Sequence, residues 1–184
     1  MENRRNRQIR KTREQIQNAL LVMLESNDIN RISIRELCQK AQINRTTFYN
    51  HYGSQYDVLK DMADQYLEDI GKTLSQAHPS DREAVHRQVE LVLKYMEEHL
   101  ELSRLLMNNP SSDFPEMLFS IPGVRDLLEH TLPADTDRNL REATVSFAIS
   151  GSWKILRDWI ACDQRIPAGQ EAQMILMLAG KVCH

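Results

Sequence analysis

Apolar residues recur along most of the chain at the spacing of an α-helix, and polar caps, asparagines and prolines separate the segments. In residues 9–26, for example, Ile16, Leu20, Met23 and Leu24 fall on one helical face. Similar patterns predict further helices in residues 33–41, 44–52, 55–77, 81–98 with a continuation through 106, 113–130 with a kink at Pro122 and Gly123, 140–161 and 167–182. The chain is therefore predicted to be all-α, with about nine helices.

Residues 32–52 combine two short helical segments with a tight turn. Ser33, followed three positions later by a glutamate, has the pattern of a capping box, and Asn44 is a favoured N-cap for the second segment. Ile43 and Phe48 flank that second cap at the spacing of a hydrophobic staple. Two short capped helices joined in this way predict a helix-turn-helix, whose second helix enters the major groove of DNA.

Charge is distributed unevenly around this motif. Residues 1–53 hold ten Lys and Arg against five Asp and Glu, whereas residues 54–184 hold thirteen against twenty-one. A net +5 in the first part and −8 in the second is expected if only the first part meets phosphate. Chance clustering of charges on solvated helices is the alternative. Residues 1–8 are polar and are predicted to form a basic arm.

Composition excludes several other classes of protein. The three cysteines have an odd count and no close spacing, so neither a disulfide framework nor a zinc site is expected. The chain contains no apolar run long enough to cross a bilayer and no signal-peptide pattern. We therefore expect a cytoplasmic protein without a cofactor, a metal site or a membrane partner.

The second helix of the motif carries side chains suited to a DNA groove. Arg45 lies in its first turn on the outward face and is the best candidate for reading a base edge, since arginine pairs with guanine through two hydrogen bonds. Thr47 is a candidate for contact with the sugar-phosphate backbone or a thymine methyl group. Ser33, at the start of the preceding helix, is a candidate for a phosphate contact.

The motif resembles one family closely. The segments Ile-Ser-Ile-Arg-Glu-Leu at 32–37 and Thr-Thr-Phe-Tyr-Asn-His-Tyr-Gly-Ser at 46–54 are similar to the N-terminal signature of the tetracycline-repressor (TetR) family of bacterial regulators. The resemblance covers roughly residues 9–59. It implies double-stranded DNA as partner, a three-helix DNA-binding domain at 1–53, and a helical effector-binding and dimerisation domain at 54–184.

The resemblance also implies roles for single residues. Thr46 takes a position near base edges, and Tyr49, Asn50 and His51 take positions that hold phosphates in the family. The chain departs from the family pattern at two positions. Gln42 occupies the turn where glycine is usual, so a left-handed backbone there is expected to be strained. Gln55 stands where lysine is common, which removes one charged phosphate contact.

The last two helical segments are apolar around much of their circumference, as buried helices are. Small residues in the first of them permit close approach of helices, and the resemblance favours dimerisation over packing only within one chain. The expected homodimer interface comprises Phe147, Ala148, Ile149, Gly151, Met174, Leu178 and Val182.

Family members often hold a small effector in the second domain, and the helix beginning at Gln55 is a natural lever between the two domains. Methionines and aromatic residues are the candidates for lining such a pocket, although ordinary core is the usual place for them. The candidate liners are Met62, Tyr66, Tyr95, Met96, Met107, Phe114, Met117, Phe147 and Trp153.

Three functions remain open from the sequence. The first is a DNA-binding repressor that responds to a small molecule, and the second is a regulator or co-activator controlled by a protein partner without a pocket. The third is an all-α enzyme. His86 and Glu90 share a helix face, but no third ligand, phosphate-binding loop or nucleophile elbow accompanies them. An enzyme is therefore not expected.

Overall fold

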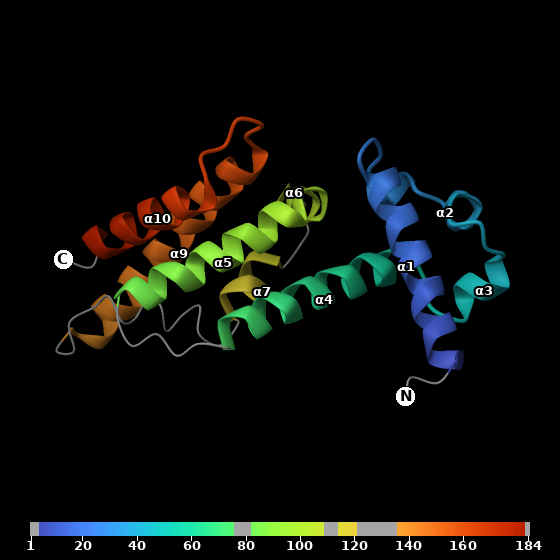
Figure 1. Ribbon diagram of the computed structural model, residues 1–184, viewed down its shortest axis with the longest axis horizontal. Helices are drawn as coiled ribbons and strands as arrows, with labels where there is room; N and C mark the ends of the chain where they lie inside the picture. The colour runs from blue at the N-terminus through green and yellow to red at the C-terminus, as the bar shows by residue number, and fades with distance from the viewer. Residues whose placement is uncertain (1–3, 76–81, 109–113, 121–135, 183–184) are drawn as a thin grey trace. The chain divides into compact units, whose positions relative to one another are not determined.

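The computed structural model describes residues 4–75, 82–108, 114–120 and 136–182, and within these ranges every regular element is a helix (Figure 1). The all-α prediction is confirmed. The chain divides into two compact units, Met1–Tyr66 and Leu67–His184. The division falls inside a continuous helix, and the expected domain boundary after residue 53 stays a prediction.

The first unit contains the helix-turn-helix. Its elements are α1 (Arg4–Leu24), the 3-10 helix η1 (Ile29–Arg31), α2 (Ile34–Lys40), α3 (Arg45–Tyr49) and the first half of α4 (Gln55–Ser75). Side chains from all four α-helices meet in a core whose most deeply buried members are Ile16, Leu20, Leu37, Phe48 and Val58, each 0% exposed.

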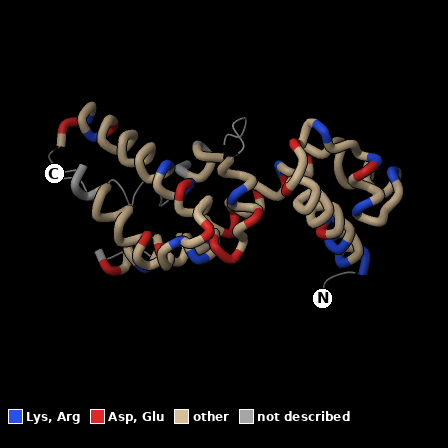
Figure 2. The backbone as a smooth tube through the Cα atoms, turned by 90° about the horizontal axis from the view of Figure 1, so that it is seen from above, with Lys and Arg blue, Asp and Glu red and all other residues tan. Residues whose placement is uncertain are grey.

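The beginning of α1 differs from the prediction. The helix starts at Arg4, not near residue 9, so the expected basic arm is wrong for residues 4–8. The segment is rich in arginine and glutamine, which are good helix formers even where no apolar residue marks a buried face. Its basic residues, which are exposed, lie along the first turns of the helix near the N-terminus, where the tube is blue in Figure 2.

The second unit contains the remaining helices and the end of α4. These helices are α5 (Arg82–Glu98), α6 (Leu100–Asn108), α7 (Phe114–Ser120), α9 (Arg138–Ala161) and α10 (Ala168–Val182). Helix α10 packs against both α5 and α9, and α6 packs against α5, α7 and α9. Gln88 of α5 donates a hydrogen bond to the Leu74 carbonyl of α4 at 3.1 Å, which ties these two helices together.

Most helix boundaries lie within two residues of those predicted. The pattern predicted across residues 98–106 is interrupted at His99, where α5 ends and α6 begins. The capping pattern at Ser80, the kink at Pro122 and Gly123, and the turn of helix at 128–130 lie outside the described residues. None of the described helices is both long and apolar enough to span a membrane.

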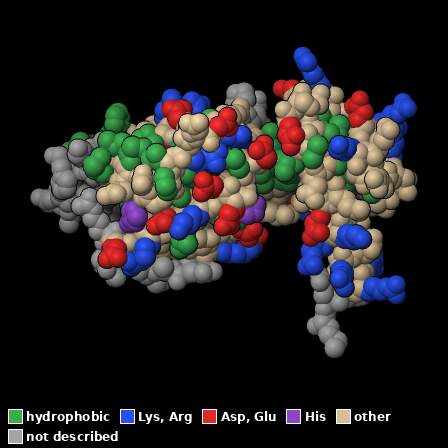
Figure 3. Space-filling model, turned by 45° about the horizontal axis from the view of Figure 1, so that its top comes forward, with side chains coloured by type: hydrophobic (Ala, Val, Ile, Leu, Met, Phe, Trp, Pro, Cys, Tyr) green, Lys and Arg blue, Asp and Glu red, His purple; other side chains and the backbone are tan. Residues whose placement is uncertain are grey.

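Part of the apolar surface of the last two helices is exposed in the single chain. Phe147 is 66% exposed and Leu140 is 60% exposed on α9, and Met177 and Leu178 of α10 are 43% and 39% exposed. Figure 3 shows hydrophobic side chains gathered on this side of the second unit, over α10. An apolar circumference predicts that a helix has partners on several sides, but it does not say that all of them belong to the same chain.

Candidate nucleic-acid interface

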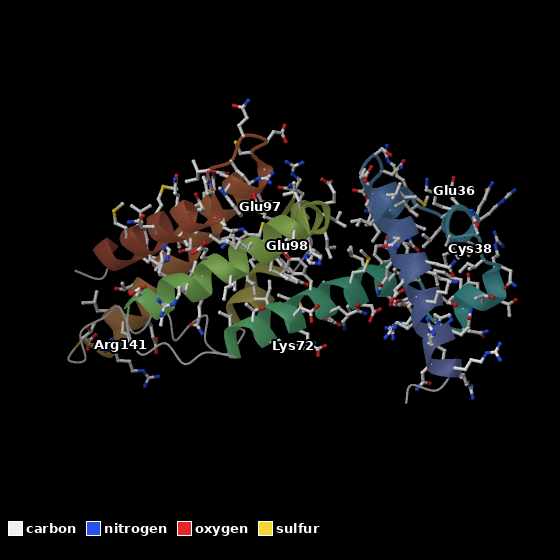
Figure 4. All side chains as sticks on the ribbon, viewed as in Figure 1. Glu36, Cys38, Lys72, Glu97, Glu98 and Arg141 are labelled. Atoms are coloured by element: carbon white, nitrogen blue, oxygen red, sulfur yellow. The ribbon has the colours of Figure 1, made fainter. Side chains whose placement is uncertain are left out.

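The first helix of the motif, α2, is fixed at its start by the predicted capping box. The Ser33 hydroxyl oxygen accepts a hydrogen bond from the backbone N–H of Glu36 at 3.2 Å. The Glu36 carboxylate in turn accepts from the Ser33 backbone N–H at 3.1 Å and from its hydroxyl at 2.6 Å. These bonds from Ser33 hold the pKa of Glu36 below its usual value. Glu36 and the buried Cys38 of the same helix are labelled in Figure 4.

The turn between α2 and α3 is left-handed at Gln42, where φ is 55°. This is the backbone conformation expected at the position where the family usually has glycine. A residue with a β-carbon pays a conformational cost there, so Gln42 is a strained position. The Asn44 side chain then accepts a hydrogen bond from the Thr47 backbone N–H at 2.7 Å, which confirms the predicted N-cap of α3.

One face of α3 is buried and the opposite face is open to solvent. Phe48 is fully buried, as predicted, and its ring makes an edge contact with the ring of Tyr49 at a centroid distance of 5.6 Å. Tyr49 itself is 57% exposed. The other predicted DNA-contacting side chains on the exposed surface are Ser33, Arg45, Thr46 and Asn50, while Thr47 and His51 are half-buried.

Ser33 differs from the others because its polar groups are already engaged. Both its hydroxyl and its backbone N–H donate to Glu36. A phosphate contact from Ser33 would have to replace a bond to this carboxylate, whose negative charge repels phosphate. The phosphate contact stays a prediction, and the observed role of Ser33 is to cap α2.

Two hydrogen bonds that the sequence pattern does not predict attach α4 to η1. The Tyr56 hydroxyl donates a hydrogen bond to the Asn30 side chain at 2.6 Å. The Gln55 side-chain amide donates to the Ile29 carbonyl at 3.5 Å. Gln55 stands where the family commonly has lysine, and its side chain reaches the backbone of another element. Only the separation of these residues in sequence hid the contact.

A second missed feature joins α1, α4 and the segment that follows α3. Four residues form it, and we call them the Asp61 cluster: Arg13, Gln17, Tyr52 and Asp61. Tyr52 is only 6% exposed and packs within the unit. Nothing in the local pattern shows that a tyrosine, a carboxylate and a guanidinium separated by up to 48 positions share one site.

The candidate liners of an effector pocket do not all have the same surroundings. Met62 and Tyr66 are buried in the first unit, whereas the other seven belong to the second. Met96, Met107 and Phe114 are buried in that unit, and Tyr95, Met117 and Trp153 are partly exposed. The rings of Phe114 and Trp153 lie together, with centroids 6.1 Å apart. Phe147 is mostly exposed, which fits the predicted interface better than a pocket.

The predicted dimer residues also separate into two groups. Ala148 is buried against Ala179 of α10, and Ile149 packs at the edge of this contact, so these residues join α9 to α10. Phe147, Gly151 and Leu178 are exposed, Met174 is half-buried, and a β-carbon at Gly151 would meet nothing within 4 Å. The side chain of Val182 lies outside the described residues.

The described part of the chain contains no group of three or more His, Cys, Asp or Glu placed to hold a metal ion. His86 and Glu90 do approach each other, with 4.0 Å between Nδ1 and Oε2. The other ring nitrogen of His86 lies 3.0 Å from the Gly169 carbonyl oxygen, so this histidine joins α5 to α10.

Comparison with known proteins agrees with this geometry. No protein-family model matches the chain. The uncharacterised HTH-type transcriptional regulator YxbF of Bacillus subtilis is 28% identical over 99 residues, which cover 51% of this chain and 26% of that protein. The matched region therefore spans about a quarter of the length of this curated relative.

Solved structures match over nearly the whole chain. A TetR transcriptional regulator from Streptococcus agalactiae has a TM-score of 0.72 and 22% identity, over 95% of this chain and 97% of its own. The dihydroxyacetone kinase operon activator DhaS has a TM-score of 0.61 and 18% identity, over 94% and 96%. The TetR-family repressor FadR of Thermus thermophilus, solved with lauroyl-CoA, has a TM-score of 0.55 and 18% identity, over 91% and 92%. The chain has the fold of TetR-family transcriptional regulators, as the resemblance implied.

Proposed function

We propose that the chain is a transcriptional regulator that binds double-stranded DNA by placing α3 in the major groove. The observation that carries this proposal is the solvent-exposed face of a short helix capped by Asn44, with an arginine in its first turn. The buried face of α3 is anchored by Phe48, so the exposed face is presented by a rigid unit. The TetR-type fold and the match to an HTH-type regulator support the same function.

In α3 and the two residues that follow it, Arg45 and Thr46 read base edges, and Tyr49, Asn50, His51 and Thr47 hold phosphates. A bidentate contact between arginine and guanine contributes about 1–3 kcal/mol of discrimination between bases. Tyr49 is the most exposed of the five tyrosines, and its hydroxyl suits a sequence-independent phosphate bond. The role of each residue rests on its place in the motif.

The regulator acts as a homodimer on a pseudo-palindromic operator. One recognition helix reads too few base pairs for selectivity in a genome, whereas two-fold symmetry doubles the site. The exposed apolar side chains of α9 and α10 support this assembly, because a surface containing Phe147, Leu140 and Leu178 is costly to leave in water. Isologous packing of the two helices from each protomer would cover it.

The second unit binds a small-molecule effector that weakens DNA binding, and the protein acts as a repressor that this effector releases from its operator. FadR, a repressor of the same fold, was solved with lauroyl-CoA, and this supports effector binding by the fold without identifying a ligand here. The adjacent rings of Phe114 and Trp153 and the buried Met96 and Met107 are the liners that the second unit offers. The lever is α4, which runs without interruption from Gln55 to Ser75 and belongs to both units.

A regulator controlled by a protein partner is the second candidate. DhaS, of the same fold, is described as an operon activator, so the fold alone does not determine the direction of control. Thermal unfolding in the presence of a metabolite panel separates the two candidates. A ligand that binds only the folded state raises the midpoint by mass action, whereas a regulator without a pocket shows no shift with any metabolite.

The DNA-binding proposal is tested by selecting bound fragments from a pool of random duplexes with the purified chain. We expect an enriched inverted repeat whose affinity falls steeply with salt, because lysine and arginine contacts release counterions from the phosphates. A chain that retains no duplex at low salt, with or without metabolites, would overturn the proposed function.

A further inference from the structure

The Asp61 cluster lies behind the recognition helix and has no part in the surface proposed to meet DNA. Its centre is the Asp61 carboxylate of α4. The Tyr52 hydroxyl donates a hydrogen bond to Oδ2 at 2.7 Å, and the Gln17 amide of α1 donates to the same oxygen at 2.8 Å. Arg13 of α1 donates from Nη2 to Oδ1 at 2.5 Å. One carboxylate therefore joins three elements of the first unit.

Tyr52 connects this cluster to α3. It follows the end of the helix by three positions, and its backbone N–H donates to the carbonyl of Phe48 at 2.9 Å. Its ring lies 6.1 Å from the ring of Phe48, which anchors α3 in the core. On the other side, Arg13 donates from Nε to the Tyr52 hydroxyl at 3.2 Å, and its guanidinium carbon lies 5.5 Å from the ring centroid.

The electrostatics of the cluster show that its carboxylate is charged and paired. Burial works to raise the pKa of Asp61, but the hydrogen bonds from Tyr52 and Arg13 prevail and hold the pKa below its usual value. Burial raises the pKa of Tyr52 to about 12, so its hydroxyl remains a donor at physiological pH. A planar guanidinium that donates to both a carboxylate and a hydroxyl demands a particular arrangement of its partners.

The fixed arrangement of hydrogen-bond partners around Arg13 is important for α3, because α3 is only five residues long. A helix of this length is not stable alone, and its direction depends on the contacts of its ends and its buried face. Phe48 supplies an apolar contact that tolerates some rotation, whereas the hydrogen bonds of Tyr52 are directional. The Asp61 cluster thus restricts the angle between α3 and the pair formed by α1 and α4.

We propose that Asp61, acting through Tyr52, is a positioning residue that holds α3 at the angle required for DNA binding. The inference rests on the proposed function. Asp61 is not a DNA contact, since its negative charge would repel phosphate and its donors come from the protein. Its effect on affinity passes through the hydroxyl of Tyr52 to the exposed face that carries Arg45.

Two substitutions and one matched control test this role in the full chain. Tyr52→Phe removes only the hydroxyl, and Asp61→Asn removes the charge while it retains the shape. Tyr56→Phe is the control, because it also removes one tyrosine hydroxyl bond from the first unit, at a residue that is 47% exposed and bonded to Asn30. The first readout is the amide spectrum of the ¹⁵N-labelled chain, in which the amides of residues 45–51 should shift in the two cluster variants but not in the control.

The second readout is affinity for an operator selected by the wild-type chain from random duplexes. Affinity should fall about tenfold in Tyr52→Phe, the size expected for one hydrogen bond to a charged group, and should change less than about twofold in Tyr56→Phe. Unchanged affinity in Tyr52→Phe would overturn the inference, whichever amides shift. So would an equal loss in both tyrosine variants.

The outcomes separate the inference from the function on which it rests. A wild-type chain that binds no duplex refutes the proposed function. A wild-type chain that binds its operator, with a Tyr52→Phe variant that is less stable but binds equally well, refutes only the positioning role. If Asp61→Asn fails to fold, Tyr52→Phe decides the question, because the phenylalanine preserves the buried ring.

Discussion

The two units bury a carboxyl group in opposite ways. In the first unit, Asp61 is charged and accepts hydrogen bonds from Arg13, Gln17 and Tyr52. In the second, Glu171 of α10 is 2% exposed, and its Oε1 has no hydrogen-bond partner among the described residues. Burial lowers the solvation of both groups, so the pKa of Asp61 falls only because of its donors, while the pKa of Glu171 is raised by burial.

The surfaces of the two units also differ in polarity. The first unit exposes polar and basic groups around α3, whereas the second exposes apolar side chains on α9 and α10. A unit whose polar groups are paired internally can present one rigid surface to DNA. A unit with an exposed apolar face and a buried carboxyl oxygen that has no partner among the described residues has interactions left for a second copy or a ligand. The predictions below test this contrast.

The largest effect is expected from placing a charge on the apolar face of the second unit. Phe147→Glu should weaken dimerisation at least about a hundredfold, because it would bury a carboxylate without a partner in the interface. Sedimentation velocity gives the dissociation constant. Leu91→Glu is the control, since Leu91 is 51% exposed on α5, outside the proposed interface. If the two substitutions raise the dissociation constant equally, or if Phe147→Glu does not change it, the exposed face that contains Phe147 is not the dimer interface.

A smaller effect follows from the unpaired acid. Glu171→Met should stabilise the second unit by about 1–3 kcal/mol, because it replaces a buried carboxyl group, whose Oε1 has no hydrogen-bond partner among the described residues, with an apolar side chain of similar length. The folded pKa of Glu171 is raised, so its proton-linked stability is present below the unfolded pKa and is lost as pH rises through the folded value. The gain should therefore be larger at pH 8 than at pH 4.

This gain is measurable in isolation because both tryptophans, Trp153 and Trp159, belong to the second unit. Denaturant unfolding followed by tryptophan fluorescence reports that unit alone. Glu142→Met serves as control, since the Glu142 side chain is 56% exposed and paired with Arg138. Destabilisation by Glu171→Met at both pH values would show that the carboxyl group of Glu171 makes a favourable interaction in the folded chain, which would contradict this prediction.

The first unit should lose folding stability at alkaline pH, because Tyr52 loses its proton there. The pKa of Tyr52 is raised from 10 to about 12, so its contribution to stability is complete below pH 10 and is lost as pH rises toward 12. The wild-type chain should lose about 1–2 kcal/mol over this interval through Tyr52. The Tyr52→Phe variant should lose less stability over the same interval. It still loses some, because Tyr95 of the second unit also has a pKa of about 12 and titrates in both chains. Unfolding followed by circular dichroism at pH 9.5 and 11.5 measures the difference, and equal losses would count against the buried hydroxyl.

The smallest effect is expected at the turn of the motif. Gln42→Gly should stabilise the first unit by about 0.5–1 kcal/mol, because glycine adopts the φ of 55° without strain. The greater freedom of glycine in the unfolded chain opposes this gain and keeps it small. Thermal unfolding of the purified variant measures this. A lower midpoint than wild type would mean that the Gln42 side chain makes a contribution greater than the strain it causes.

The local pattern of residues was sufficient to predict the helices, their caps and the exposed face of α3. Ser33 and Asn44 cap their helices as predicted because a cap depends on residues three positions apart. The Asp61 cluster and the bond between Tyr56 and Asn30 were not predictable, since they join residues 9 to 48 positions apart. The sequence placed Phe147 both in a pocket and in an interface for a related reason, because hydrophobicity does not distinguish a face buried by the same chain from one left for another.

The most direct test of the account compares wild-type chain and Arg45→Ala for binding to a selected operator and to random duplex of equal length. Arg87→Ala, which removes an exposed arginine from α5 of the second unit, is the control for charge alone. We predict that Arg45→Ala lowers the ratio of operator to random affinity by about tenfold or more and that Arg87→Ala leaves it unchanged. An unchanged ratio in Arg45→Ala would contradict the claim that α3 reads the sequence.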